Sequence, residues 1–201
     1  MSLARLTQCR HWVFDMDGTL TVGVHDFQYI RRALDIPPDR DILEYLEALP
    51  DSRREASHAW LMAHERQLAL GATAARGAKA LIRALRVRGD HLGILTRNAR
   101  ELAHTTLQAI ELSDVFAIEN VLGRECAPPK PHPGGLEHFF IRWDIEPARV
   151  IMVGDSPLDM QCGRAAGAGT LLINTPENPC PEAVDHHLDD CEALLTALQL
   201  G

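Results

Sequence analysis

Short apolar runs alternate with amphipathic stretches along most of the chain. Apolar runs bounded by turn residues are typical of buried parallel strands, whereas apolar positions spaced three and four residues apart are typical of helices. The pattern predicts strands at 11–16, 91–96, 115–121, 149–154 and 170–174. It predicts helices at 73–88, 98–110, 134–143 and 157–167, with a last one at 189–199. This alternation indicates an α/β fold with a doubly wound parallel sheet.

Residues 20–72 interrupt the alternation, because they contain helical patterns but no convincing strand. The pair Pro37-Pro38 and the single Pro50 divide the segment, and proline ends a helix or opens its first turn. The helical patterns lie near 26–35, 38–49 and 52–70. A segment of this length is too long for a simple connection between two strands. We therefore expect a core domain formed by 1–19 and 73–201, and a small helical cap domain formed by 20–72.

The composition is that of a globular protein. The chain is 46% hydrophobic and 24% charged, and its 201 residues are enough for one ordinary domain and a small insert. No apolar run has the length of a bilayer span, and residues 1–8 lack the apolar core of a signal peptide. The five cysteines are scattered, which favours reduced thiols, no zinc site and a cytoplasmic protein. The net charge of −8 disfavours nucleic acid as a partner.

Two carboxylates follow the first predicted strand. The run Trp12-Val13-Phe14 leads into Asp15, Met16, Asp17 and Gly18, and strand periodicity places the two aspartates on one face. They lie at the carboxyl end of the strand, where open α/β sheets bind ligands, and they repel each other unless a cation or a shared proton holds them. By itself the segment also fits an acidic turn after a strand. Calcium-binding loops carry Asp-x-Asp-Gly too, but there the motif is followed by a glutamate and is not preceded by a buried strand.

Three later segments carry further polar candidates at strand ends or in loops. Thr96 ends the apolar run that starts at 92, and Lys130, one of only two lysines, lies in a proline-rich loop. Asp155 ends the run that starts at 150, and Asp159 follows one helical turn later. Each has a plain structural interpretation as well: Thr96 as a helix N-cap, Lys130 as a loop lysine, and Asp159 as an acid favoured by the helix dipole.

Taken in order, the four segments resemble the four motifs of the haloacid dehalogenase superfamily, over residues 11 to about 175. The resemblance implies a Rossmann-like core and a magnesium-dependent phosphatase that forms an aspartyl-phosphate. It makes Asp15 the nucleophile and Asp17 the general acid and base. Mg²⁺ would be held by Asp15, Asp155 and the backbone carbonyl of Asp17. The place of the insert, after the first motif, resembles the type 1 caps of that superfamily.

The same resemblance assigns the residues around the phosphate. Thr96 would donate its hydroxyl, and Arg97 and the backbone N–H groups after Thr96 would also bind phosphoryl oxygens. Lys130 would offset the negative charge and position the nucleophile. Asp159 would orient Asp155 or a metal-bound water.

The substrate is less determined. Members that resemble phosphoglycolate phosphatases commonly continue Asp-Gly-Thr-Leu with Val-Asp-Ser-x-Pro, whereas this chain has Thr-Val-Gly-Val-His over 21–25. His25 either faces the active site from the hinge or lies on the surface. Phosphoglycolate remains the best single expectation for a small phosphorylated substrate, handled by a monomer or a homodimer.

Other functions on the same fold stay open to different degrees. A phosphomutase of the β-phosphoglucomutase kind would keep the same core, and so would a non-catalytic regulatory or phosphoprotein-binding protein. A dehalogenase has no use for Asp17. Phosphonate cleavage needs a cap lysine, which 20–72 lacks.

Overall fold

A six-stranded sheet forms the centre of the molecule, in the order β3-β2-β1-β4-β5-β6, and each neighbouring pair is parallel. The computed structural model describes residues 3–200. The strands are β1 (His11–Phe14), β2 (His91–Leu95), β3 (Val121–Leu122), β4 (Val150–Gly154), β5 (Gly169–Leu172) and β6 (His186–His187). The predicted doubly wound parallel sheet is confirmed, and β1 lies at its centre between β2 and β4.

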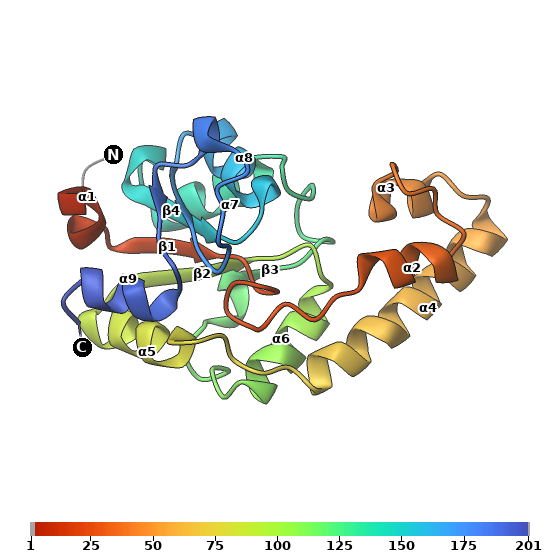
Figure 1. Ribbon diagram of the computed structural model, residues 1–201, viewed down its shortest axis with the longest axis horizontal. Helices are drawn as coiled ribbons and strands as arrows, with labels where there is room; N and C mark the ends of the chain where they lie inside the picture. The colour runs from red at the N-terminus through yellow and green to blue at the C-terminus, as the bar shows by residue number, and fades with distance from the viewer. Residues whose placement is uncertain (1–2, 201) are drawn as a thin grey trace.

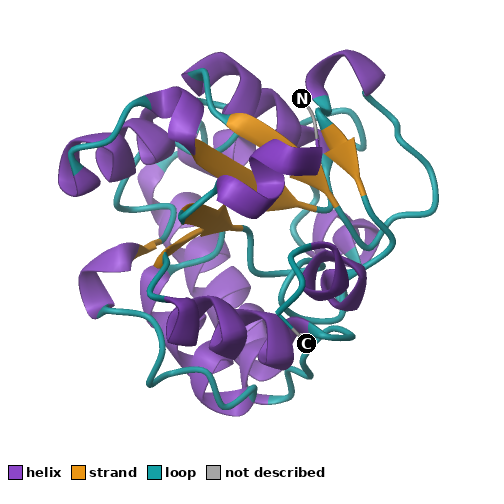
Figure 2. Ribbon diagram, turned by 90° about the vertical axis from the view of Figure 1, so that its left-hand side faces the viewer, coloured by secondary structure: helices purple, strands orange, loops and turns teal. Residues whose placement is uncertain are grey.

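Helices cover both faces of this sheet (Figures 1 and 2). The α-helices of the described residues are α1 (Leu3–Gln8), α2 (Phe27–Ala33), α3 (Ile42–Glu47), α4 (Asp51–Leu70), α5 (Ala78–Arg88), α6 (Arg100–Ala109), α7 (Gly134–Trp143), α8 (Pro157–Ala166) and α9 (Cys191–Ala197). Trp12 and Phe14 of β1 pack with α1, α5, α6 and α9 in one hydrophobic cluster. Val13, between them, packs with α7 and α8 in a second cluster on the other face. This is the alternation that a strand buried on both faces requires.

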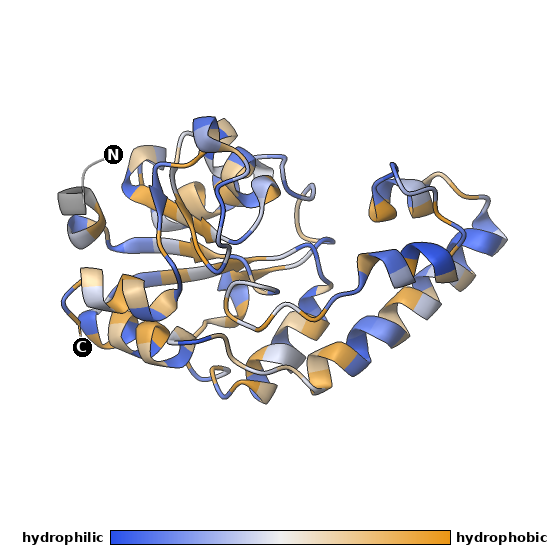
Figure 3. Cartoon of the chain, viewed as in Figure 1, coloured by the Kyte–Doolittle hydropathy of each residue, from blue (hydrophilic) through white to orange (hydrophobic). Residues whose placement is uncertain are grey.

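Part of the segment between β1 and β2 projects from the carboxyl end of the sheet as α2, α3 and α4, whereas α5 packs on the sheet (Figure 1). We call Phe27–Leu70 the helical insert. Ile30, Leu46 and Leu61, one from each helix, are buried against one another in a small hydrophobic cluster of its own. Figure 3 shows how strongly the insert mixes polar and apolar residues along each helix. The C-terminal part of α4 packs against α6 of the core, so the insert is anchored at one end.

Two parts of the sheet differ from the prediction. The strand predicted at 115–121 is wrong, because only Val121 and Leu122 pair with β2 and Ile118–Asn120 is a 3₁₀ turn. Val115 and Phe116 are apolar because they are buried in the core as loop residues, so their hydrophobicity did not report a strand. No strand was predicted at His186–His187, which forms β6 because its backbone pairs with β5 without apolar side chains. Among the described residues, no helix is both long and apolar enough to span a bilayer.

Candidate active site

Asp15 follows the central strand β1 directly and is only 8% exposed. Its backbone N–H donates to the carbonyl of Val153 in β4, at 2.9 Å, so the neighbouring strand fixes its position. Successive strands are added on one side of β1 up to β3, and from β4 onward they are added on the other side. The boundary between β1 and β4 is therefore the topological switch point of the sheet. Ligands of open α/β sheets bind at this point, outside the carboxyl ends of the strands. Asp15 therefore occupies the position where such a fold places its chemistry.

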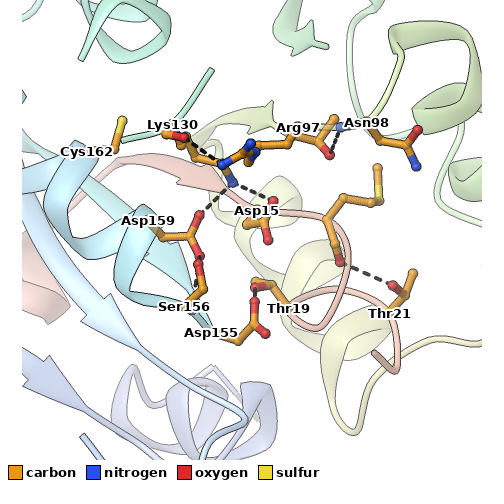
Figure 4. A network of polar contacts seen from close by, with 12 residues as sticks. Asp15, Thr19, Thr21, Arg97, Asn98, Lys130, Asp155, Ser156, Asp159 and Cys162 are labelled. Atoms are coloured by element: carbon orange, nitrogen blue, oxygen red, sulfur yellow. Dashed lines mark hydrogen bonds and ion pairs between the residues drawn. The ribbon is translucent and has the colours of Figure 1, made fainter. Parts of the chain in front are cut away.

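Lys130 joins two of the predicted site residues (Figure 4). Its Nζ donates to Oδ1 of Asp15 and to Oδ1 of Asp159, both at 2.6 Å, and the lysine is 3% exposed. Burial by itself would lower the pKa of Lys130, but the two carboxylates raise it above its ordinary value. Burial raises the pKa of Asp15, with Lys130 opposing and Asp159 and Asp155 adding to the rise. The site thus holds more negative charge than one lysine balances.

Asp155 lies after β4 and faces the loop that follows Asp15 (Figure 4). Its Oδ1 accepts a hydrogen bond from the Thr19 hydroxyl at 3.0 Å. Burial and the charge of Asp159 raise the pKa of Asp155 to about 6. Gly18 has φ +87°, and a Cβ there would lie 2.3 Å from Oδ2 of Asp155. Only glycine allows both the turn and the close approach of the carboxylate.

Asp159 is completely buried near the N-terminus of α8. Its Oδ2 accepts from the backbone N–H and the hydroxyl of Ser156, at 3.1 and 2.6 Å, while Oδ1 accepts from Lys130. This is a capping box whose acid also holds the catalytic-site lysine. The sequence predicted that Asp159 would orient Asp155 or a metal-bound water. In the structure its hydrogen bonds go to Ser156 and Lys130, and one of its oxygens lies within 4.8 Å of oxygens of Asp15 and Asp155.

The loop after β2 carries Thr96, Arg97 and Asn98. Thr96 is 4% exposed, and its Oγ1 accepts from the Asn98 N–H at 3.0 Å, which leaves the hydroxyl hydrogen available to a ligand. Arg97 reaches the helical insert, where Nη2 contacts Oδ2 of Asp41 at 2.5 Å. Its Nη1 donates to the carbonyl of Lys130 at 3.2 Å. The Arg97 guanidinium is therefore already engaged, unlike the Thr96 hydroxyl.

The donor set fits a hard divalent cation. One oxygen from each of Asp15, Asp155 and Asp159 lies within 4.8 Å of the others. Carboxylate and carbonyl oxygens are the ligands that Mg²⁺ prefers. A cation here would offset the burial and the charge of Asp159, which raise the pKa of Asp155. The carboxylate of Asp17 does not belong to this close group, although Asp17 lines the pocket that opens over these residues.

A pocket of about 330 Å³ opens over these residues, between the core and the helical insert. The core supplies Asp15, Asp17, Thr96, Lys130 and Asp155, among other residues. The insert and the segment leading into it supply His25, Phe27, Ile30, Arg31, Asp41, Ile42, Leu43, Leu61 and Glu65. His25 thus lies on the pocket.

The family follows from comparison with known proteins. A model of the haloacid dehalogenase-like hydrolase family matches residues 26–173. The chain belongs to the haloacid dehalogenase-like hydrolase family. The family prediction and the prediction of an enzyme of the hydrolase class are therefore confirmed.

Relatives extend over most of this hydrolase. A haloacid dehalogenase-like hydrolase domain-containing protein of Arabidopsis thaliana is 34% identical, over 84% of this chain and 72% of its own. A phosphoglycolate phosphatase of Nitrosospira multiformis is 31% identical, over 85% of this chain and 74% of its own. A solved hydrolase from Pseudomonas syringae superposes with a TM-score of 0.76 at 20% identity, covering 94% of this chain and 98% of its own, which supports the fold.

Some residues of this haloacid dehalogenase-like site had no signal in the sequence. Asn174, after β5, donates from Nδ2 to the carbonyls of Gly18 and Thr19, at 2.8 and 2.9 Å, and so holds the loop of the first motif. Glu65 of α4 lines the pocket and forms an ion pair with Arg124. Nothing local marks these residues, because their partners are distant in sequence.

Proposed function

We propose that this hydrolase is a magnesium-dependent phosphatase that cleaves small phosphate monoesters through an aspartyl-phosphate intermediate. One observation carries the proposal: the buried carboxylate of Asp15 ends the central strand, is held by Lys130, and faces a pocket beside Asp155. A nucleophile, a fixed positive charge and a cation site together are what phosphoryl transfer requires. A phosphoglycolate phosphatase among the relatives supports the same reaction class.

In the proposed mechanism, an oxygen of Asp15 attacks phosphorus, and the bond from phosphorus to the ester oxygen breaks. Asp17 gives its proton to the leaving oxygen, so the alcohol departs neutral. Asp17 then takes a proton from a water molecule, which attacks the phosphorus of the aspartyl-phosphate and releases inorganic phosphate. Lys130 and the Thr96 hydroxyl stabilise the negative charge of the phosphoryl oxygens throughout.

Asp15, Asp155 and the backbone carbonyl of Asp17 would hold Mg²⁺. When bound, the cation supplies positive charge against the phosphoryl oxygens and the clustered carboxylates. Asp159 is committed to Lys130 and Ser156, so its role is to position the lysine.

We also propose that 20–72 acts as a cap over a core made of 1–19 and 73–201. Among the described residues, three ion pairs cross from the insert to the core: Asp41 with Arg97, Glu65 with Arg124, and Arg66 with Glu101. A cap in this position would limit the size of the substrate and, when closed over the site, would exclude bulk water from the reacting phosphate.

The first test is a screen of purified protein with Mg²⁺ against phosphorylated metabolites, with phosphoglycolate included because of the named relatives. We expect release of inorganic phosphate that stops when EDTA is added. Transfer of the phosphate to a second position of the substrate, without release, would indicate a phosphomutase. Absence of both reactions with every ester would contradict the proposed function.

Asp17→Asn should separate the two chemical steps. With a good leaving group such as an aryl phosphate, phosphorylation of Asp15 needs little acid help, whereas hydrolysis of the intermediate still needs a base. The phosphorylated enzyme should therefore accumulate after acid quench and add the mass of one phosphoryl group by intact mass spectrometry. Absence of that added mass at every quench time would contradict the role of Asp17.

Mg²⁺ should stabilise the protein through Asp155. A ligand present at about 100 times its dissociation constant adds about 2.7 kcal/mol to the free energy of unfolding. Each kcal/mol raises the melting temperature by roughly 2–4 °C in a domain of this size. Asp155→Asn keeps an acceptor for Thr19 but removes the charge, so it should abolish most of the shift and slightly raise the metal-free melting temperature. Asp51→Asn, an exposed acid of the insert, is the matched control. Equal shifts in wild type and Asp155→Asn would exclude Asp155 as a ligand.

A further inference from the structure

Asp41 of the helical insert forms an ion pair with the core at the reaction pocket. Its Oδ2 accepts from Nη2 of Arg97 at 2.5 Å, and both residues line the pocket. Their side chains are 32% and 24% exposed, so water screens the pair only in part. Burial acts to raise the pKa of Asp41, but the backbone N–H of Glu44 and the Arg97 guanidinium hold it below its ordinary value. Asp41 is therefore charged at neutral pH.

The other oxygen of Asp41 begins the helix α3. Oδ1 accepts from the backbone N–H groups of Leu43 and Glu44, at 3.0 and 3.2 Å. Asp41 is thus the N-cap of α3. A single carboxylate fixes the start of a helix of the insert and also contacts the core.

The ion pair of Asp41 differs in place from the other ion pairs between the insert and the core. Those pairs start from α4, the helix that is anchored on α6. They are Glu65 with Arg124 and Arg66 with Glu101. Among the ion pairs of residues 3–200, the pair Asp41–Arg97 is the one that joins the α2–α3 part of the insert to the core.

Arg97 connects Asp41 to the residues of the proposed reaction. Its Nη1 donates to the carbonyl of Lys130 at 3.2 Å, and Nζ of Lys130 donates to Oδ1 of Asp15 at 2.6 Å (Figure 4). A chain of three contacts therefore leads from the insert to the nucleophile. A guanidinium has five N–H donors, and the bonds to Asp41 and Lys130 use two of them. Three donors remain for the oxygens of a phosphate.

Lys130 and Arg97 differ in where their carboxylate partners lie. Lys130 pairs with Asp15 and Asp159, which both belong to the core. The carboxylate partner of Arg97 is Asp41, which belongs to the insert, so a displacement of the insert takes it away. A long side chain that is not held in place loses more conformational entropy when it binds a ligand. The position of the insert therefore bears on Arg97 and not on Lys130.

We propose that Asp41 is a positioning residue, which holds the Arg97 guanidinium beside the Lys130 loop so that the phosphate meets both cations only while the insert lies over the core. The inference rests on the proposed phosphatase function and goes beyond it, since it ties phosphate binding to the position of the insert. Arg97 binds the phosphate, and Asp41 acts through Arg97. Closure of the insert and binding of phosphate then favour each other, because both stabilise the same placement of Arg97.

Asp41→Asn tests the proposal without removing the cap of α3, because asparagine is as good an N-cap as aspartate. We expect the KM of an aryl phosphate and the inhibition constant of inorganic phosphate to rise about three- to tenfold, as for a partly exposed charge-assisted hydrogen bond. The kcat should change less than twofold, because binding is lost equally in the ground and transition states. Both constants are measured with Mg²⁺ by release of the aryl alcohol. Unchanged constants would overturn the inference. Lower constants would overturn it too, since they would mean that Asp41 withholds Arg97 from the phosphate.

A double-mutant cycle tests whether Asp41 acts through Arg97. Arg97→Gln alone should raise KM at least as much as Asp41→Asn does. Adding Asp41→Asn to Arg97→Gln should raise KM no further, because the group that Asp41 positions is already absent. Effects that multiply in the double variant would overturn the inference, since Asp41 would then favour binding without Arg97.

Two control variants each share one property with Asp41. Asp26→Asn changes the exposed N-cap of α2, which accepts from the N–H of Tyr29 within the insert. Glu101→Gln breaks the exposed ion pair with Arg66, which also crosses from the insert to the core. Both variants should keep the wild-type constants. A rise in either one as large as that of Asp41→Asn would show a general loosening of the insert and overturn the role of Asp41. Absence of phosphate release by the wild type from every ester would contradict the proposed function itself, whereas an active wild type with unchanged constants in Asp41→Asn would overturn only this inference.

Discussion

Asp15→Asn is expected to lower the rate of phosphate release on the order of 10⁴-fold or more, as the loss of other covalent nucleophiles does. The asparagine amide occupies the same space but cannot attack phosphorus as the carboxylate does. The measurement is steady-state phosphate release with Mg²⁺, using the best ester of the screen. A variant that kept more than a tenth of the wild-type activity would exclude an aspartyl-phosphate at this position.

A comparison of stabilities shows whether this loss is chemical. Lys130 keeps its contact with Asp159 in the variant, and one of the crowded carboxylates loses its charge. We therefore expect Asp15→Asn to melt at or slightly above the metal-free wild type. Asp39→Asn, on the exposed surface of the insert, serves as the control and should keep wild-type activity.

Lys130→Met should affect both activity and stability. The change removes the fixed positive charge beside the nucleophile, so the rate should fall by about 10²–10³-fold. It also leaves Asp15 and Asp159 buried without their cation, and breaking a buried pair in this way costs about 3–5 kcal/mol. At roughly 2–4 °C per kcal/mol, the melting temperature of the metal-free protein should fall by about 6–20 °C.

The chain provides a matched control in its other lysine. Lys79→Met removes an exposed ion pair with Glu111, which is worth about 0.2–1 kcal/mol, so activity and melting temperature should hardly change. The double variant Lys130→Met/Asp159→Asn also removes the charge of one of the two acids that lost their cation. It should regain much of the lost stability but none of the lost activity. Equal destabilisation by the two single lysine variants would show that Lys130 is not a buried structural cation.

The strands that carry the chemistry could be predicted because each is recognisable locally. The run Trp12-Val13-Phe14 is continuously apolar, as a strand buried on both faces must be, and β1 occurs there. The apolar runs before Thr96 and Asp155 likewise form strands, β2 and β4. Parallel strands end at one edge of a sheet, so a prediction of the strands also placed these polar residues near one another.

Local patterns failed where burial and secondary structure separate. Val115 and Phe116 are buried as loop residues, and β3 begins only at Val121. His186–His187 has no apolar periodicity, yet β5 offers an edge to which its backbone pairs. An apolar residue indicates that its side chain is buried, whereas hydrogen bonds to a neighbouring strand decide whether the backbone forms a strand.

The sequence by itself determined the doubly wound sheet, the helical character of the insert and the set of residues at the strand ends, because periodicity and chain direction are local properties. Only the tertiary structure decided how those residues pair. Lys130 reaches Asp15 across 115 positions, and Glu65 reaches Arg124 across 59. Such partners depend on how the helices pack against the sheet, and packing is a property of the whole core rather than of any segment.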